Sequence, residues 1–253
     1  MVSLQNNLDN YENLIEILKE KDSIALDEFM EILDNEYNID INIEIAKSLG
    51  IPLFINGDEI SLKTRDSIFN SLFCIVDIET TGFSPQENDI IEIGAIKYKN
   101  GNIIDRFESY AFTKEIPDKI TEITGIDGSM IANAPKINKV LERFKIFLED
   151  SVFMAHNITF DFNFINEKLS QNKIPIMKNR TICTLQLARK TIQAPKYGLG
   201  YLNEFLNIDY PVRHRAFADC IIALKVFEYS LLNLSNEILS VEDLITFTKN
   251  KKS

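Results

Sequence analysis

The sequence FCIVDIETTG, residues Phe73–Gly82, joins a short apolar run to two closely spaced acids. Its first four residues are apolar and partly β-branched, a pattern that predicts a buried strand. Asp77 and Glu79 are two positions apart, so a strand would direct both carboxylates to the same face of a sheet. The Thr-Thr-Gly triplet that follows predicts the end of the strand and a turn. Such an acid pair on its own is most often a solvated surface, so its meaning depends on the rest of the chain.

Two further clusters contain the only two histidines of the chain, together with acids. Residues 156–161, HNITFD, follow an apolar run, and Asp161 stands near the start of an amphipathic stretch with helical spacing. Asn157 is the predicted N-cap of that helix. His214 precedes Asp219 by five residues, which on a helix is about 500° of rotation, or about 140° between the two side chains. We therefore expect His214 at or before a helix start and Asp219 one turn into the helix.

The clusters together supply four carboxylates, those of Asp77, Glu79, Asp161 and Asp219. Four carboxylates at one site repel each other unless divalent cations lie among them, and oxygen ligands suit Mg²⁺ or Mn²⁺. Two such cations about 4 Å apart are the usual apparatus for in-line displacement at phosphorus. The combination, with each cluster at a strand end or a helix start, therefore predicts two divalent cations, Mg²⁺ or Mn²⁺, and phosphodiester chemistry.

The motifs DIETTG at 77–82, HNxxFD at 156–161 and HxxxxD at 214–219 resemble the three exonuclease motifs of the DEDD superfamily. The histidine five residues before the last aspartate resembles the DEDDh branch. That branch includes the epsilon proofreading subunit of bacterial DNA polymerase III (DnaQ-like), PolC-type polymerases, oligoribonuclease, RNase T and the TREX-type enzymes. The resemblance covers roughly residues 72–232, and the sequence ITEITGI at 120–126 is also similar to the proofreading and PolC-type members.

The resemblance implies a 3′–5′ exonuclease, a phosphodiester hydrolase with a two-metal mechanism that releases nucleoside 5′-monophosphates. It also implies an α/β fold of the ribonuclease H-like type, a mixed five-stranded sheet flanked by helices. We predict that the four carboxylates bind the metal ions, with Asp77 placed to bridge both. We predict that His214 is the general base, because a histidine can take a proton from water at neutral pH.

The neighbours of the motifs are predicted to form the substrate pocket. They lie on the first motif, on the ITEITGI segment and on the second motif, and they are Ile78, Thr80, Thr81, Ile123, Thr124, His156, Asn157 and Phe160. For Phe160, stacking on a base and packing in the core are open alternatives. For His156 the alternatives are contact with phosphate and a structural role. We favour the structural role because one base is enough for this chemistry.

The catalytic residues cannot separate DNA from RNA. We predict exonuclease action on DNA 3′ ends in polymerase proofreading or repair, and thus a role in DNA replication. The alternative is a 3′–5′ exoribonuclease of the RNase T or oligoribonuclease type. An inactive exonuclease fold used as a binding module is a third hypothesis, which the complete set of carboxylates disfavours. Single-stranded or frayed 3′ ends are the predicted substrates, and a DNA polymerase subunit is a possible partner.

The chain is predicted to have four parts. Residues 1–63 form a small acidic helical domain of winged-helix-like type, 64–71 a linker, 72–232 the exonuclease domain, and 233–253 a C-terminal helix with a basic tail. Residues 1–70 carry fifteen acidic and five basic side chains, so they hold ten of the eleven net negative charges of the chain. An acidic surface repels phosphates, so we predict a protein partner for this domain rather than DNA.

Periodicity and turn residues predict the individual elements. In the first domain they are helices at 8–20, 25–34 and 40–49, then a hairpin around Asn56-Gly57. In the second they are strands at about 72–79, through 91–95, from 102 to 112, at 152–155 and at 180–183, and helices at about 136–149, 160–171, 184–193, 198–206, 216–232 and 240–249.

Three further features of the composition carry expectations. No apolar run is long enough to span a membrane and no signal pattern begins the chain, so we expect a cytoplasmic protein without membrane contact. Cys74, Cys183 and Cys220 are scattered, which predicts buried reduced thiols and no zinc site or disulfide. Residues 178–215 are basic, which suits either a phosphate-binding strip or a solvated helix face.

Overall fold

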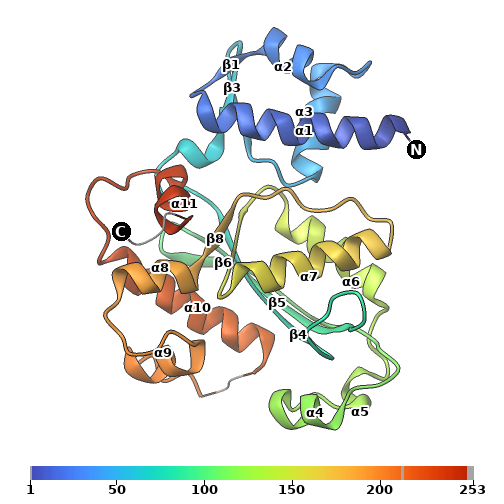
Figure 1. The fold of residues 1–253 in the computed structure, drawn as a ribbon, viewed down its shortest axis with the longest axis vertical. Helices are drawn as coiled ribbons and strands as arrows, with labels where there is room; N and C mark the ends of the chain where they lie inside the picture. The colour runs from blue at the N-terminus through green and yellow to red at the C-terminus, as the bar shows by residue number, and fades with distance from the viewer. Residues whose placement is uncertain (1, 212–213, 250–253) are drawn as a thin grey trace.

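Two β-sheets organise the chain, one in each of two parts of the sequence (Figure 1). The computed structural model describes residues 2–211 and 214–249. The smaller sheet has three strands in the order β1-β3-β2, and the larger has five in the order β6-β5-β4-β7-β8. None of the helices among these residues combines the length and the apolar character needed to cross a bilayer.

The N-terminal part is built from three helices and the smaller sheet. Its elements are α1 (Val2–Glu20), β1 (Ile24–Ala25), α2 (Leu26–Leu33), α3 (Ile39–Ser48), β2 (Leu53–Asn56) and β3 (Glu59–Leu62). The predicted helices and hairpin are all present, whereas β1 was missed because two residues carry no periodicity. The hydrophobic core of this part is drawn from residues 11–62 alone. Its winged-helix-like character stays a prediction.

The larger sheet is mixed, as predicted. An antiparallel meander joins β4 (Phe73–Thr80), β5 (Ile90–Lys99) and β6 (Asn102–Tyr110). The turn between β5 and β6 uses Asn100 and Gly101, which both have positive φ and so match the twist of a tight hairpin. On the other side of β4, β7 (Val152–Ala155) pairs with it in parallel, and β8 (Thr181–Cys183) pairs in parallel with β7.

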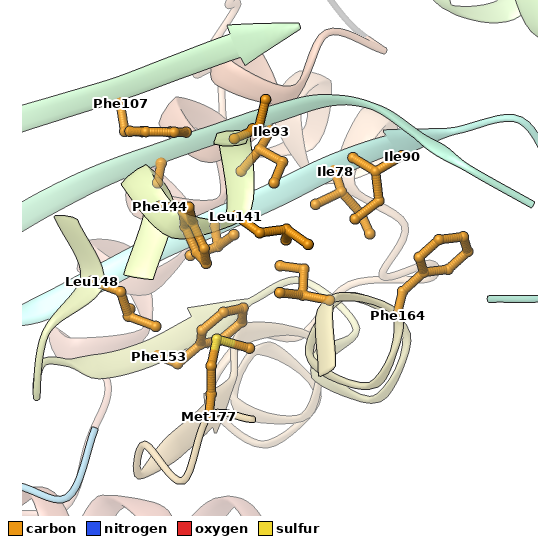
Figure 2. Packing of buried hydrophobic residues seen from close by; sticks show 14 of the residues in the cluster. Ile78, Ile90, Ile93, Phe107, Leu141, Phe144, Leu148, Phe153, Phe164 and Met177 are labelled. Atoms are coloured by element: carbon orange, nitrogen blue, oxygen red, sulfur yellow. The ribbon is translucent and has the colours of Figure 1, made fainter. Parts of the chain in front are cut away.

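Helices cover both faces of this sheet (Figure 1). One face packs on α6 (Ile137–Leu148) and α7 (Ile158–Gln171), in the apolar cluster that Figure 2 shows. The other face packs on α8 (Thr184–Thr191), α10 (Ala216–Leu231) and α11 (Val241–Lys249). The remaining helices, α4 (Asp118–Thr124), α5 (Gly128–Ile131) and α9 (Leu199–Phe205), are short.

The alternation along β4 sets which face receives the acids. Cys74, Val76 and Ile78 lie in the cluster with α6 and α7, whereas Phe73 and Ile75 lie in the cluster with α8, α10 and α11. Asp77 and Glu79 continue the second series, so a period of two directs them to the side of α10. The strand that contributes side chains to both apolar clusters therefore also determines the direction of the two carboxylates.

The predicted linker is a packed segment. Lys63–Arg65 form one turn of 3₁₀ helix, and Ile68 belongs to the same core cluster as α10 and α11. The buried Thr64 donates its hydroxyl to Glu242 at 2.6 Å. Because α11 shares this core with β4, the core of the larger part continues past residue 232. Most of the predicted basic tail lies outside the described residues.

Candidate active site

Three acids from two elements converge on one side of the sheet. Asp77 and Glu79 lie on β4, and Asp219 lies in the first turn of α10. One carboxylate oxygen from each lies within 4.8 Å of the others, which is close enough for a single cation to bind all three. His214 precedes α10, so the structure has the arrangement that the five-residue spacing predicts.

Asp161 approaches the same region from α7. It lies in the first turn of that helix and is buried. Hydrogen bonds from the backbone at Ile78 and at Asp161 itself reach its carboxylate. Its charge is the strongest of the neighbouring carboxylate charges acting on Asp77. Asp161 therefore stands beside Asp77, held by the strand that carries the first motif.

The electrostatics of this cluster favour added positive charge. Burial, and then repulsion from Asp161, Asp219 and Glu79, raises the pKa of Asp77 well above its ordinary range. Burial, and then repulsion from Asp219, Glu92 and Asp161, raises the pKa of Glu79 to about 8, and burial raises that of Asp161 to about 7. A ligand set made only of carboxylate oxygens suits hard divalent cations such as Mg²⁺ or Mn²⁺. The residues present therefore fit the metal that the motifs imply.

His214 is exposed and adopts a left-handed backbone conformation with φ of 56°. It directly precedes Arg215, the N-cap residue of α10. The residue is thus open to solvent at the N-terminal end of the helix that carries Asp219.

His156 has both ring nitrogens engaged within the protein. Nδ1 lies 2.9 Å from Oγ1 of Thr184, and Nε2 lies 2.8 Å from the carbonyl oxygen of Tyr197. Burial lowers the pKa of this imidazole, which favours the neutral form. These contacts tie the end of β7 to the start of α8 and to the loop before α9, an arrangement that favours the structural role over phosphate contact.

The turn of the first motif uses its own polar groups. Thr80 donates its hydroxyl to the carbonyl of Gly82 at 2.7 Å, and Thr81 forms a backbone and a side-chain hydrogen bond with the backbone of Asp89. The side chain of Ile78 lies in the apolar cluster of Figure 2, and the backbone at that residue binds Asp161. These groups shape the turn and orient Asp161, and their contact with the substrate stays a prediction.

The second predicted pocket segment, with Ile123 and Thr124, lies on the short helix α4, which was not among the predicted elements. Thr124 is buried near the end of α4, and its hydroxyl donates to Ile120 and accepts from the amide of Ile126. Ile123, on the same helix, is exposed. Asn157 is the N-cap residue of α7, as predicted, but its φ is 108° and its side chain makes no capping hydrogen bond.

An exposed aromatic residue beside the motif was missed. Phe83 directly follows the motif turn, is 89% exposed, and meets the half-buried Phe160 edge to face at 6.4 Å between ring centroids. Phe160 in turn contacts Phe164 at 5.5 Å. The signal was an aromatic residue placed directly after DIETTG, where a polar turn residue is usual. The pair forms an apolar contact between the turn of the first motif and the first turn of α7.

The basic strip does not form as a continuous surface. Arg180 pairs with Glu242, Lys178 with Glu12 and Arg215 with Glu92. Lys190 lies over the ring of Phe247 and binds its carbonyl, Arg189 has a partner within the protein, and Lys196 is exposed. Arg213 lies outside the described residues. Most of these charges hold elements together, so the interpretation as a phosphate-binding strip is not supported.

Known exonuclease and DNA polymerase sequences match most of this chain. A family model described as exonuclease (RNase_T) matches residues 74–227. A DNA polymerase III PolC-type protein from Clostridium perfringens is 36% identical over 210 residues, which are 82% of this chain and 14% of that relative. A DNA polymerase III subunit epsilon from Aquifex aeolicus is 31% identical over 169 residues, which are 66% of this chain and 84% of that relative. The chain thus spans a small part of the PolC-type protein and most of the epsilon subunit.

Solved structures share the fold. Exonuclease I matches with a TM-score of 0.62 at 18% identity, over 72% of this chain and 44% of that one. The nuclease domain of 3′hExo, a DEDDh family member bound to rAMP, matches with a TM-score of 0.57 at 19% identity, over 66% of this chain and 94% of that one. The predicted fold class is confirmed for the larger part of the chain.

The carboxylate cluster predicts a pH-dependent stability of the metal-free protein. The pKa values of these carboxylates are higher in the folded protein than in the unfolded chain. Their contribution to the free energy of unfolding is therefore fully present below the unfolded-state pKa of about 4. That contribution is lost as the pH rises through the folded values of about 7 and about 8. The melting temperature in EDTA should therefore fall from pH 5 to pH 8, and Mg²⁺ or Mn²⁺ should raise it more at pH 8 than at pH 5.

Asp77→Asn is the control for other titrating groups. It removes one charge from the cluster, so the metal-free variant should melt higher than the parent chain at pH 8 and respond less to metal. A melting temperature in EDTA with the same pH dependence in both chains would contradict the assignment.

Proposed function

The chain belongs to the exonuclease family, and on this premise we propose that it removes nucleoside 5′-monophosphates from DNA 3′ ends in polymerase proofreading or repair. The observation that carries the proposal is the group of Asp77, Glu79 and Asp219 within 4.8 Å, with the buried Asp161 beside it. Such a group suits cleavage at phosphorus, and the relatives that span residues of both parts are DNA polymerases.

Asp77, Glu79 and Asp219 would hold one divalent cation, Mg²⁺ or Mn²⁺, and Asp77 with Asp161 a second. Bound there, such cations lower the pKa of a bound water and neutralise charge that develops on the phosphate. The buried walls of the site keep the carboxylates fixed, so no reorganisation is needed during the reaction.

His214 acts as the general base in this proposal and takes the proton of the attacking water. Its exposed position next to α10 lets the ring return that proton to solvent after each cleavage. His156, with both nitrogens bound to protein, instead keeps β7 and α8 in register beside Asp161.

The terminal base stacks on Phe83 and Phe160. Every base has an aromatic face, so stacking binds a 3′ end without regard to sequence, as an exonuclease requires. The exposure of Phe83 and its edge contact with Phe160 support this role.

The N-terminal part binds a protein in this proposal. On α3, Ile41 is 45% exposed and lies with Ile45 beside the acids Asp40 and Glu44. An apolar face flanked by acids repels phosphate and suits a protein surface that is apolar with basic neighbours. A polymerase subunit is the partner we favour, and a cytoplasmic location follows from a replication role.

Digestion of labelled substrates tests the central proposal. With Mg²⁺ the chain should shorten DNA with a mismatched 3′ end stepwise, faster than RNA of the same sequence, and EDTA should stop the reaction. Asp77→Asn should lose several orders of magnitude in rate with an unchanged circular dichroism spectrum. Faster digestion of RNA would establish the exoribonuclease alternative, and inactivity on both substrates would establish a binding module.

The two histidines should behave differently when each is replaced. His214→Ala should lower kcat by about 10²–10⁴-fold near neutral pH, as loss of a general base does, without lowering the melting temperature. His156→Ala should lower the melting temperature because two internal hydrogen bonds are lost. A mild effect of His214→Ala together with a severe loss of kcat in folded His156→Ala would reverse the assignment.

Removal of the N-terminal part should leave an active enzyme. The two parts have separate hydrophobic cores. The contacts that join them include hydrogen bonds from Arg65 to backbone carbonyls at the end of α1, and the ion pair of Lys178 with Glu12. Residues 66–253 should therefore fold and digest single-stranded ends. Residues 1–63 should fold, leave duplex DNA unbound at low salt and bind a polymerase subunit, more weakly after Ile41→Ser. An aggregated truncation, or salt-sensitive DNA binding by residues 1–63, would contradict this.

A further inference from the structure

Two glutamates lie directly opposite each other beside the site. Glu79 on β4 pairs in register with Glu92 on β5, so both side chains project from the same face of the sheet. Like charges in such a pair are destabilising, and Glu92 is only 1% exposed. A buried charge in this position requires a partner of opposite charge.

Arg215 is that partner. Its Nε lies 3.2 Å from each carboxylate oxygen of Glu92, and its Nη2 lies 2.8 Å from Oε1. The amide of Ala216 donates to Oε2 at 2.9 Å, and Nη2 of Arg215 also contacts the hydroxyl of Tyr110. Glu92 thus binds the N-cap residue and the first residue of α10, and its carboxylate is directed to the helix start.

Gly94 brings the same helix start against the backbone of β5. A Cβ on this residue would lie 2.4 Å from the amide nitrogen of Phe217 and 2.5 Å from the carbonyl carbon of Ala216. Cys220 donates its thiol to the carbonyl of Gly94 at 3.2 Å. Gly94 is also the cross-strand neighbour of Asp77. The first turn of α10 is therefore fixed on β5 at two positions, both opposite the acids of the first motif.

We propose that Glu92 and Arg215 are positioning residues for the reaction. Their ion pair fixes the first turn of α10 and so sets Asp219 against Asp77 and Glu79, and it anchors the residue that follows His214. This inference rests on the proposed exonuclease function. It gives a role to a charge in an otherwise apolar strand segment, IIEIGAI at 90–96.

Removing one partner of a buried pair has unequal consequences on the two sides. Arg215→Met leaves the Glu92 carboxylate buried and unpaired opposite Glu79, which displaces the helix start or the acids. Glu92→Gln leaves an arginine whose side chain is 31% exposed and can be hydrated, and the glutamine oxygen can still accept from Ala216. The double variant has neither the unpaired charge nor the repulsion, so it should be better than Arg215→Met alone.

The experiment measures kcat, the KM for a DNA oligonucleotide, the melting temperature and the affinity for Mn²⁺ in the metal-stripped chain. Arg215→Met should lower kcat by about 10²-fold, the scale of a 1 Å misplacement, with a KM within about threefold of the parent value. It should also weaken Mn²⁺ binding. Adding Glu92→Gln should recover at least about tenfold of kcat and part of the Mn²⁺ affinity.

Arg180→Met is the matched control. Arg180 and Glu242 form a comparable ion pair, with side chains 8% and 15% exposed. Arg180 directly precedes β8, an edge strand of the same sheet, and Glu242 lies on α11. This variant should lower the melting temperature but leave kcat per folded molecule and Mn²⁺ affinity unchanged.

Two outcomes would overturn the inference. One is an Arg215→Met chain that, like the control, loses only stability. The other is a double variant no better than Arg215→Met. A parent chain that digests no nucleic acid would defeat the proposed function instead, and the Mn²⁺ affinities of the same variants would still report on positioning.

Discussion

Mutual repulsion of carboxylates gathered at one site constrains the architecture around it. Asp77, Glu79, Asp161 and Asp219 come from β4, α7 and α10, and burial raises the pKa of the first three, with repulsion from neighbouring acids adding to the rise for Asp77 and Glu79. Like charges stay close together only where each is held by an element fixed in the core, because a mobile segment would move its charge into water. The acids are therefore carried by elements that are anchored on both faces of the sheet, and β4 contributes side chains to the core on each of them.

The sequence predicted the larger part well where side-chain periodicity and packing coincide. Short apolar runs predicted β4 and β7, and apolar positions at helical spacing predicted α6 and α10. These patterns exist because each element buries one or two faces in the core. α4, α5 and β1 were missed because they are too short to show a period. Their conformation depends on caps and on tertiary contacts, such as the left-handed Gly125 that ends α4.

Side-chain roles were harder to predict than elements, for a physical reason. The motifs give residue types at fixed spacing, and this was enough to predict that Asp77, Glu79 and Asp219 lie together. Whether a polar group faces a substrate or another part of the protein depends on partners far away in the sequence. Thr81 is bound by Asp89 and His156 by Tyr197, and the basic residues of 178–215 pair with acids that a local reading cannot connect to them.

The acids at the site divide into two groups according to what balances their charge. Glu92 is balanced by Arg215, a charge that belongs to the protein and is always present. The carboxylates of Asp77, Glu79 and Asp219 are close enough to bind one cation, whose occupancy would depend on its concentration. The fixed pair keeps β5 and α10 together whether or not a cation is bound, so the protein does not depend on metal for this contact. Glu92 of this ion pair lies directly opposite Glu79 across β4 and β5. The carboxylates are therefore already positioned for a cation before one binds.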